Sequence, residues 1–122
     1  MEDSYFFDTY AIVEVLKGSP QYSIFKQSRI TVTVFNLAEL HYKIRRDFDK
    51  ETADQVLADY LPFVIAVSET IIRAASEFKL IHRRRDLSLA DAIGYVAALQ
   101  LGIKFLTGDK QFEDFPGVEF VK

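Results

Sequence analysis

The stretch Lys104-Phe105-Leu106-Thr107-Gly108-Asp109 decides how the rest of the chain is interpreted. Its short apolar run is typical of a buried strand that ends at Thr107, and Gly108 then turns the chain so that Asp109 follows the strand. The start of the chain repeats this arrangement, because the aromatic run Tyr5-Phe6-Phe7 is followed directly by Asp8. Ligands of α/β proteins bind just beyond the carboxyl ends of the strands, so both acids are candidate functional residues.

Apolar runs alternate with helical patterns along the chain, which predicts an α/β fold. The helical patterns are punctuated by Gly, Pro and Ser and cover residues 11–17, 20–27, 34–48, 50–60, 69–84 and 89–101. The short apolar runs predict strands at 5–8, 29–33, 63–67, 105–107 and 118–121. Because such alternation favours parallel pairing, we expect one domain over residues 1–122: a three-layer α/β/α sandwich with a mostly parallel sheet of four to five strands.

The composition bounds the function. The 122 residues are 49% hydrophobic and carry a formal net charge of −3, so bulk charge does not attract nucleic acid. A phosphate-bearing partner therefore needs a local basic patch or a metal ion between it and the protein. The absence of Cys excludes disulfides and thiolate metal sites and fits a cytoplasmic protein. The acidic start and the short apolar runs predict neither a signal peptide nor a membrane-spanning segment.

Four acids stand near predicted strand ends or helix starts, namely Asp8, Glu39, Asp91 and Asp109. Each has an ordinary structural explanation. Asp8 is placed to cap a helix, and an Asp after Gly, as at 109, is common in turns. Glu39 could form an ion pair with Lys43 one helical turn later. Asp91 is the third residue of a helix preceded by a Ser, which is the pattern of a capping box.

The joint placement of the four acids favours a metal site. In a doubly wound sheet the carboxyl ends of the strands share one edge, so all four side chains can converge there. Clustered carboxylates repel one another, and such a group usually holds a cation. Oxygen ligands without Cys favour Mg²⁺ or Mn²⁺ over Zn²⁺. His41 and His82 lack a partner at metal-binding spacing and are interpreted as surface residues or residues behind the site.

Four short motifs carry a resemblance to a known family: Phe6-Phe7-Asp8-Thr9, Asn36-Leu37-Ala38-Glu39-Leu40, Leu89-Ala90-Asp91-Ala92 and Leu106-Thr107-Gly108-Asp109-Lys110-Gln111-Phe112. With these motifs the chain resembles the PIN-domain ribonucleases, and most of all the small VapC-type toxins of prokaryotic toxin–antitoxin pairs. The resemblance extends over essentially the whole chain. Thr9 is an accepted variant of the first motif, and Asn36 receives no role.

The resemblance implies a metal-dependent endoribonuclease that hydrolyses RNA phosphodiester bonds. Asp8, Glu39, Asp91 and Asp109 would then be the catalytic acids that bind Mg²⁺ or Mn²⁺, and the Thr107 hydroxyl would orient the site. A metal-bound water would attack the phosphate in line, so no protein nucleophile is needed. Two alternatives stay open: a catalytically inactive PIN-like module for binding or dimerisation, and a PIN nuclease of RNA processing that has no antitoxin.

The same resemblance implies a homodimer and a cognate antitoxin, which lays an apolar helix on the toxin and directs a basic side chain toward the acids. Val13, Tyr22, Ile24 and Phe25 offer aromatic and aliphatic surface for that helix. The alternative is that these residues belong to the core, and this is the preferred interpretation for Ile24 and Phe25.

The densest positive run contains Arg83, Arg84 and Arg85, which are candidate RNA-binding residues. The alternative explanation is a solvated helix end, because basic residues near a helix C-terminus complement its dipole. Tyr10 and Tyr42 are candidates for stacking on the bases of single-stranded RNA.

Overall fold

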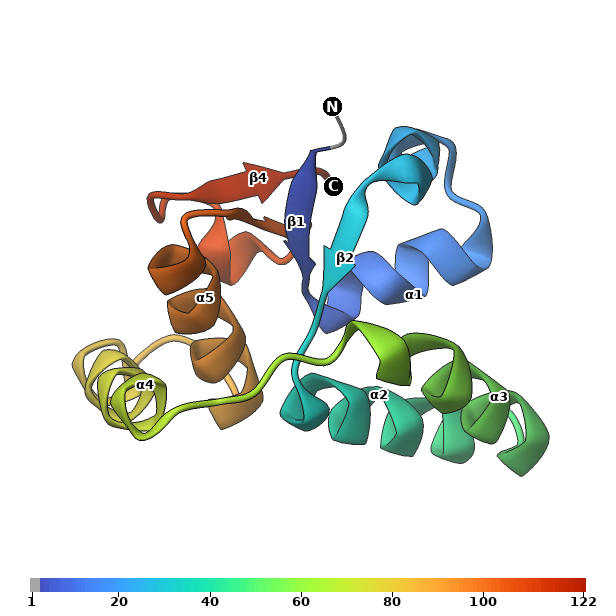
Figure 1. Cartoon of the computed structure of the whole chain (residues 1–122), viewed down its shortest axis with the longest axis horizontal. Helices are drawn as coiled ribbons and strands as arrows, with labels where there is room; N and C mark the ends of the chain where they lie inside the picture. Colours follow the sequence, from blue (N-terminus) through green and yellow to red (C-terminus); the bar gives the residue numbers. More distant parts are fainter. Residues whose placement is uncertain (1–2) are drawn as a thin grey trace.

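A computed structural model describes residues 3–122 and contains, within that range, a sheet of four parallel strands (Figure 1). The strands are β1 (Ser4–Phe7), β2 (Arg29–Thr31), β3 (Lys104–Thr107) and β4 (Val118–Phe120). Their order across the sheet is β2-β1-β3-β4, and every neighbouring pair is parallel. The predicted fold class, an α/β/α sandwich with a mostly parallel sheet, is therefore confirmed.

Five α-helices and three short 3₁₀ helices surround the sheet within the described range. The α-helices are α1 (Thr9–Lys17), α2 (Val34–Asp47), α3 (Lys50–Tyr60), α4 (Glu69–Ile81) and α5 (Leu89–Leu101). The 3₁₀ helices are η1 (Pro20–Gln27), η2 (Leu61–Phe63) and η3 (Lys110–Phe112). Figure 1 shows α4 and α5 on one side of the sheet, and α1, α2 and α3 on the other.

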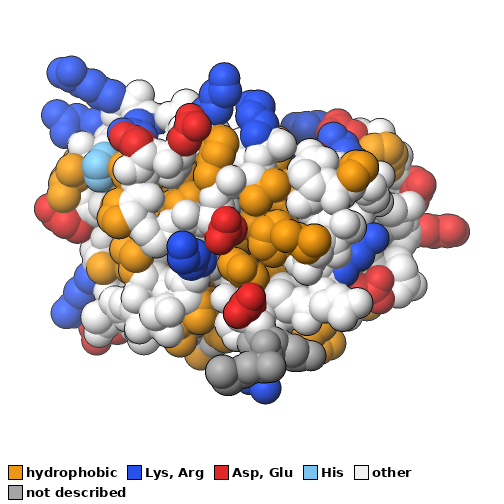
Figure 2. Space-filling view, turned by 90° about the horizontal axis from the view of Figure 1, so that it is seen from above, with side chains coloured by type: hydrophobic (Ala, Val, Ile, Leu, Met, Phe, Trp, Pro, Cys, Tyr) orange, Lys and Arg blue, Asp and Glu red, His pale blue; other side chains and the backbone are white. Residues whose placement is uncertain are grey.

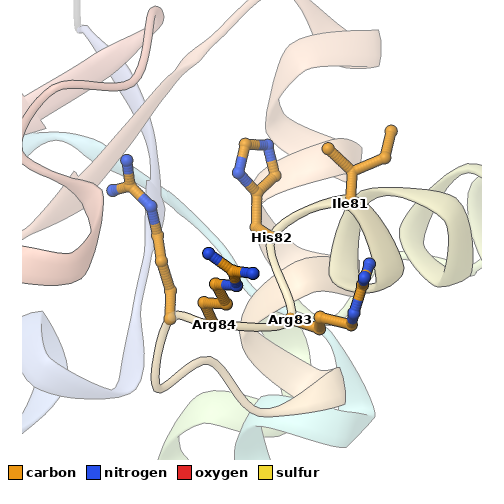
Figure 3. Close-up of a pocket in the computed structure, with 5 residues that line it drawn as sticks. Ile81, His82, Arg83 and Arg84 are labelled. Carbon is orange, nitrogen blue, oxygen red and sulfur yellow. The ribbon is translucent and has the colours of Figure 1, made fainter.

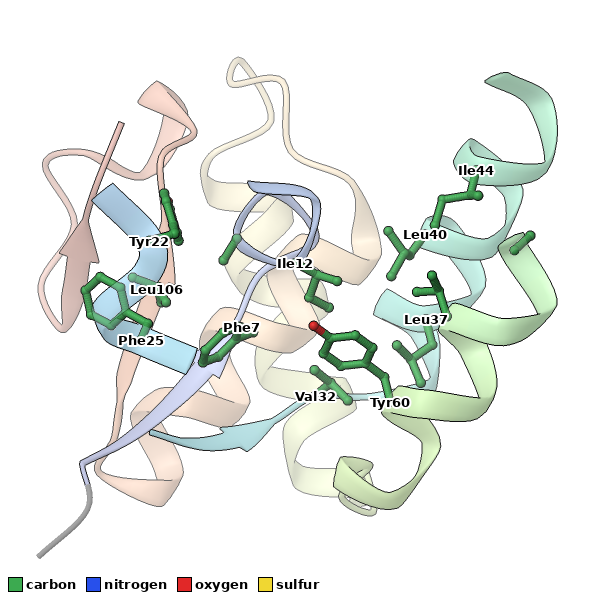
Figure 4. Packing of buried hydrophobic residues seen from close by; sticks show 13 residues of the cluster. Phe7, Ile12, Tyr22, Phe25, Val32, Leu37, Leu40, Ile44, Tyr60 and Leu106 are labelled. Atoms are coloured by element: carbon green, nitrogen blue, oxygen red, sulfur yellow. The ribbon is translucent and has the colours of Figure 1, made fainter. Parts of the chain in front are cut away.

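Alternation along the two central strands creates two cores. Phe7 and Leu106 point to the face covered by α1, η1, α2 and α3, where they join the cluster drawn in Figure 4. Phe6 and Phe105 point to the opposite face and pack with the buried residues of α4 and α5. Strands that are buried on both faces read as continuous apolar runs, as the two central strands of this sheet do.

The strand order creates a topological switch point between β1 and β3. The chain leaves β1 for β2 on one side and later returns to β3 on the other side of β1. The hydrogen bonding between β1 and β3 continues to the carboxyl ends of both strands, because the backbone N–H of Asp8 donates to the carbonyl oxygen of Leu106 at 3.1 Å. Ligand sites of doubly wound sheets form at such a point, beyond the carboxyl ends of the strands.

The strand predicted over 63–67 is wrong. Only Val64 forms a β-bridge, an isolated parallel one to Val32, which follows the last residue of β2. The segment instead crosses from α3 to α4 past the β2 edge (Figure 1). Val64 packs against the core under α1 to α3, whereas Ile65 and Val67 pack against the core under α4 and α5. Its apolar residues therefore serve both cores, which explains why the segment has the composition of a strand without being one.

Figure 2 shows the face at the amino-terminal end of β1, where acidic and basic side chains are interspersed among apolar ones. This face lies at the end of the molecule away from the carboxyl end of β1. Across residues 3–122, every helix is too short or too polar to cross a bilayer.

Candidate functional site

One groove of about 980 Å³ collects the four predicted acids at the switch point of the sheet. Its lining includes Asp8, Glu39, Asp91 and Asp109, so the structure brings all four together. Asp8 follows β1 and Asp109 follows β3, whereas Glu39 comes from α2 and Asp91 from the first turn of α5. Four elements far apart in sequence therefore contribute one carboxylate each to the same concave surface.

Asp8 is the most deeply buried of the four, with only 2% of its surface exposed. Its Oδ2 accepts a hydrogen bond from the Thr107 hydroxyl at 2.7 Å, whereas the buried Oδ1 has no partner in the described part of the chain. Asp8 stands at the N-cap position of α1, but its side chain makes no capping hydrogen bond. Helix capping therefore does not account for this acid.

The surroundings of Asp8 penalise its negative charge. Burial raises the pKa of this carboxyl to about 7, and the negative charge of Asp91 adds to the shift, while the hydrogen bond from Thr107 and the nearby backbone N–H of Thr9 oppose it. A buried carboxylate with an unused oxygen and an acidic neighbour is in the environment that a bound cation would relieve.

Ser88 connects two of the acids. Ser88 Oγ donates to Glu39 Oε1 at 3.2 Å, and Ser88 Oγ also accepts the backbone N–H of Asp91 at 3.0 Å. Asp91 Oδ2 accepts the backbone N–H of Ser88 at 2.9 Å, which completes the predicted capping box. The capping role and the place in the groove are therefore not alternatives for Asp91. Burial raises its pKa, and the charges of Glu39 and Asp109 raise it further.

The alternative explanation of Glu39, an ion pair with Lys43, finds no support, because this pair is not among the ion pairs within 4 Å formed by residues 3–122. The bond from Ser88 takes its place on the Glu39 carboxylate. Sequence patterns recognise the cap at Ser88, but its bond to a residue 49 positions away depends on the tertiary fold.

Thr107 and Asp109 form a hydrogen-bonded turn after β3. Thr107 Oγ1 accepts the backbone N–H of Asp109 at 3.0 Å, and Asp109 Oδ1 accepts that of Gln111 at 3.0 Å, so Asp109 caps η3. Gly108 between them is buried against the Tyr10 ring and the Val121 carbonyl, which leaves no space for a Cβ atom. Glycine is therefore required in this turn by close approach.

The carboxylate oxygens of the groove are the kind of ligand that a hard divalent cation prefers, but they are not yet arranged to coordinate one. Among residues 3–122, no three His, Asp or Glu side chains are arranged so that they could hold a metal ion as they stand. The unused buried Oδ1 of Asp8 is nevertheless an oxygen donor without another role, and the carboxylates of Glu39, Asp91 and Asp109 line the same groove. Oxygen donors of this kind suit Mg²⁺ or Mn²⁺, and the side chains would have to close around the ion.

Neither histidine lines the groove. His41 Nε2 is 2.9 Å from Asp54 Oδ1, and the His82 ring packs between the rings of Phe78 and Phe115. Both therefore have structural partners outside the acidic site.

Beyond the four candidate acids, the groove is lined by apolar side chains and by charged side chains of both signs, and its further acids are Glu14, Asp47 and Asp86. Tyr10, Val13, Leu16, Ile44 and Phe48 line it together with Lys17 and Lys43. Of the surface expected to receive an antitoxin helix, Val13 lines the groove, whereas Tyr22 and Phe25 are buried in the core. The expectation that Ile24 belongs to the core is wrong, because 75% of its surface is exposed on the outer side of the 3₁₀ helix η1.

A second, smaller hollow of about 360 Å³ is lined by Ile81 to Arg85, where the chain turns after α4 (Figure 3). Arg83 Nη1 donates to the Leu80 carbonyl at 3.2 Å, and Arg85 forms an ion pair with Asp114. The exposed Arg84 makes no hydrogen bond or ion pair with any other described residue. Asp86, the next residue after this run, lines the acidic groove, so the two hollows are neighbours.

Comparisons with known proteins agree with this fold. The family model described as PIN domain matches residues 5–118. No curated protein sequence matches the chain. VapC20 of Mycobacterium tuberculosis, a sarcin–ricin-loop-cleaving toxin, superposes with a TM-score of 0.79 at 20% identity, covering 98% of this chain and 100% of that one. A toxin–antitoxin complex from Klebsiella pneumoniae gives a TM-score of 0.73 at 18% identity, with 95% and 96% covered. DNA-bound VapBC from Salmonella typhimurium gives 0.71 at 16%, with 98% and 97% covered.

Proposed function

Because the chain belongs to the PIN domain family, we propose that it is a divalent-metal-dependent endoribonuclease that acts as the toxin of a toxin–antitoxin pair. The observation that carries this proposal is the buried, unpartnered Oδ1 of Asp8 in a groove lined by Glu39, Asp91 and Asp109. A structural acid would use both oxygens in hydrogen bonds, because an unpaired buried polar atom is costly. An acid that binds a cation can leave one oxygen without a hydrogen bond, because that oxygen coordinates the ion.

We propose Asp8, Glu39, Asp91 and Asp109 as the residues that hold Mg²⁺ or Mn²⁺. When bound, the ion lowers the pKa of a water molecule and neutralises charge on the scissile phosphate. The Thr107 hydroxyl fixes the Asp8 carboxylate through Oδ2 and leaves Oδ1 free. Ser88 fixes the carboxylates of Glu39 and Asp91 relative to each other. These hydrogen bonds orient Asp8, Glu39 and Asp91 in the free chain, and the side chains would still have to close around a bound ion.

The partners are RNA, an antitoxin and a second copy of the chain. We propose that the antitoxin lays an apolar helix over the Tyr10, Val13, Leu16 and Phe48 part of the groove and directs a basic side chain toward the acids. Phe48 is 75% exposed in the free chain, which suits a surface that is covered in a complex. We also propose that the run Arg83–Arg85 lies beside the path of bound RNA, because it adjoins the groove, and that Arg84, which has no side-chain partner among residues 3–122, is the arginine of this run that contacts a phosphate.

The decisive experiment incubates the purified chain with structured and single-stranded RNAs in the presence of Mg²⁺, Mn²⁺ or EDTA. We expect cleavage that depends on the metal and that falls on the order of 10²- to 10⁴-fold in Asp8→Asn, since a lost metal contact removes several kcal/mol of transition-state stabilisation. Asp59→Asn is the matched control, because Asp59 is an exposed acid of α3 outside the groove.

Two alternatives give different results. An inactive PIN-like module would bind RNA or a protein without cutting any RNA, and a calorimetric titration would show no Mn²⁺ binding that depends on Asp8. A PIN nuclease of RNA processing would cut RNA, but it would neither arrest growth when expressed nor be neutralised by a product of a neighbouring gene.

A further inference from the structure

Arg85 makes more contacts than either of its arginine neighbours. Its Nη1 and Nη2 atoms donate to the two carboxylate oxygens of Asp114 at 2.8 and 3.0 Å. Nη1 also donates to the Gln111 carbonyl at 2.7 Å, and the guanidinium lies 4.3 Å from the centre of the Phe115 ring. The planar guanidinium is suited to this combination of a two-pronged ion pair and ring stacking, which a lysine could not reproduce.

The hydrogen bond from Arg85 to Gln111 connects Arg85 to two of the four acids, Asp109 and Asp8. The residue whose carbonyl Arg85 binds, Gln111, donates its own backbone N–H to Asp109 Oδ1. The backbone N–H of Asp109 in turn donates to Thr107 Oγ1, and that hydroxyl donates to Asp8 Oδ2. A continuous series of hydrogen bonds therefore runs from the Arg85 guanidinium to the buried carboxylate of Asp8.

Arg85 is also connected along the chain to the other two acids, Glu39 and Asp91. Arg85 stands in the short loop between α4 and α5, three residues before Ser88, which holds Glu39 and Asp91. The loop is fixed between these points, because Leu87 is buried and its carbonyl accepts a hydrogen bond from Lys79 Nζ at 2.7 Å. Because Leu87 is held in place, we expect a displacement of Arg85 to move Ser88 as well.

We propose that Arg85 is a positioning residue, which ties the turn that carries Asp109 to the loop that carries Ser88 and so sets the spacing of the two halves of the acidic groove. This inference rests on the proposed function, since the spacing matters only if the four acids act together. It separates Arg85 from Arg84, whose side chain has no partner among residues 3–122 and remains available for a phosphate.

The test uses RNA-free protein and follows Mn²⁺ binding by calorimetry, together with amide hydrogen exchange over residues 109–114. In Arg85→Ala we expect Mn²⁺ affinity to fall by about 10-fold, as for residues that orient metal ligands, and exchange over 109–114 to accelerate. Arg85→Lys should recover part of both losses. Asp114→Asn should weaken the ion pair while it leaves the bond from Arg85 to the Gln111 carbonyl in place.

The matched control is Arg73→Ala, because Arg73 is an exposed arginine in an ion pair with Glu69 on α4, outside the groove. It should leave Mn²⁺ affinity unchanged. On an RNA that the wild type cuts, Arg85→Ala should lower kcat and leave KM and the salt dependence of RNA binding unchanged, whereas a residue that contacts RNA would change the latter two.

The outcomes separate this inference from the proposed function. A wild-type chain that binds no Mn²⁺ would overturn both. A wild type that binds Mn²⁺, with a folded Arg85→Ala variant that binds it equally well, would overturn the positioning role alone. Weakened RNA affinity with normal Mn²⁺ affinity in Arg85→Ala would assign Arg85 to the RNA contact instead.

Discussion

The acidic groove and the arginine-lined hollow differ in how their charges are held. Asp8 and Asp91 are held by hydrogen bonds from Thr107 and Ser88 in surroundings that raise the pKa of both carboxyls. The hydrogen bond from Arg85, by contrast, lowers the pKa of the exposed Asp114 carboxyl, which is the ordinary behaviour of a surface ion pair. The fold thus works against ionisation in one region and favours it in the other, which is how binding sites commonly differ from surface charge.

Among changes that leave all four acids in place, the largest effect should come from replacing Thr107, whose hydroxyl orients Asp8. Replacing Thr107 by Val keeps the shape of the side chain but removes the donor to Asp8 Oδ2 and the acceptor for the backbone N–H of Asp109. We expect RNA cleavage to fall about 10- to 100-fold, as is typical when a partner of a metal ligand is lost. Initial rates measured at saturating Mn²⁺ would check this.

Thr9 provides the matched control for Thr107. It is also buried, it adjoins Asp8 in sequence, and its hydroxyl has no hydrogen-bond partner in the described chain. Thr9→Val therefore removes no hydrogen bond and should reduce cleavage far less than Thr107→Val. Equal losses in the two variants would mean that volume, and not the Thr107 hydroxyl, matters at this edge of the sheet.

The next effect is the pH dependence of stability without metal. The unfolded Asp8 carboxyl ionises near pH 4, whereas the folded one keeps its proton to about pH 7. Between these values the folded chain binds the extra proton, so its stability falls as pH rises through this window and the loss is complete above it. Asp8→Asn cannot ionise, so the stability of the variant relative to wild type should rise by about 2 kcal/mol between pH 5 and pH 8.

Urea unfolding of both proteins in EDTA at the two pH values would measure this difference. A constant difference would mean that Asp8 is not held in the surroundings described above. A marked loss of stability in both Asp8→Asn and Asp109→Asn would favour purely structural roles for the two acids.

The sequence was sufficient to predict the elements that place the acids, because strands buried on both faces and capped helices leave local patterns. It failed where apolar residues serve a purpose other than local structure. The run at 63–67 has strand composition because it contributes to both cores, and Ile24 is apolar yet exposed. Contacts between distant loops, such as Arg85 with Asp114 or Ser88 with Glu39, leave no local pattern at all.

The smallest effects should distinguish the two regions as surfaces for RNA. Lys43 lines the groove and Arg84 the smaller hollow, and neither forms an ion pair within residues 3–122. In an Asp8→Asn background, which keeps the RNA intact, each change to Ala should reduce the slope of log K against log salt concentration for single-stranded RNA by about 0.7, the contribution of one phosphate contact.

Lys104→Ala serves as the control, because Lys104 begins β3 and so lies at the opposite end of the strand from Asp109. Fluorescence anisotropy at several salt concentrations gives the slopes. A reduced slope for Lys43→Ala alone would confine RNA to the groove, whereas slopes unchanged in both variants would show that neither cation contacts the strand.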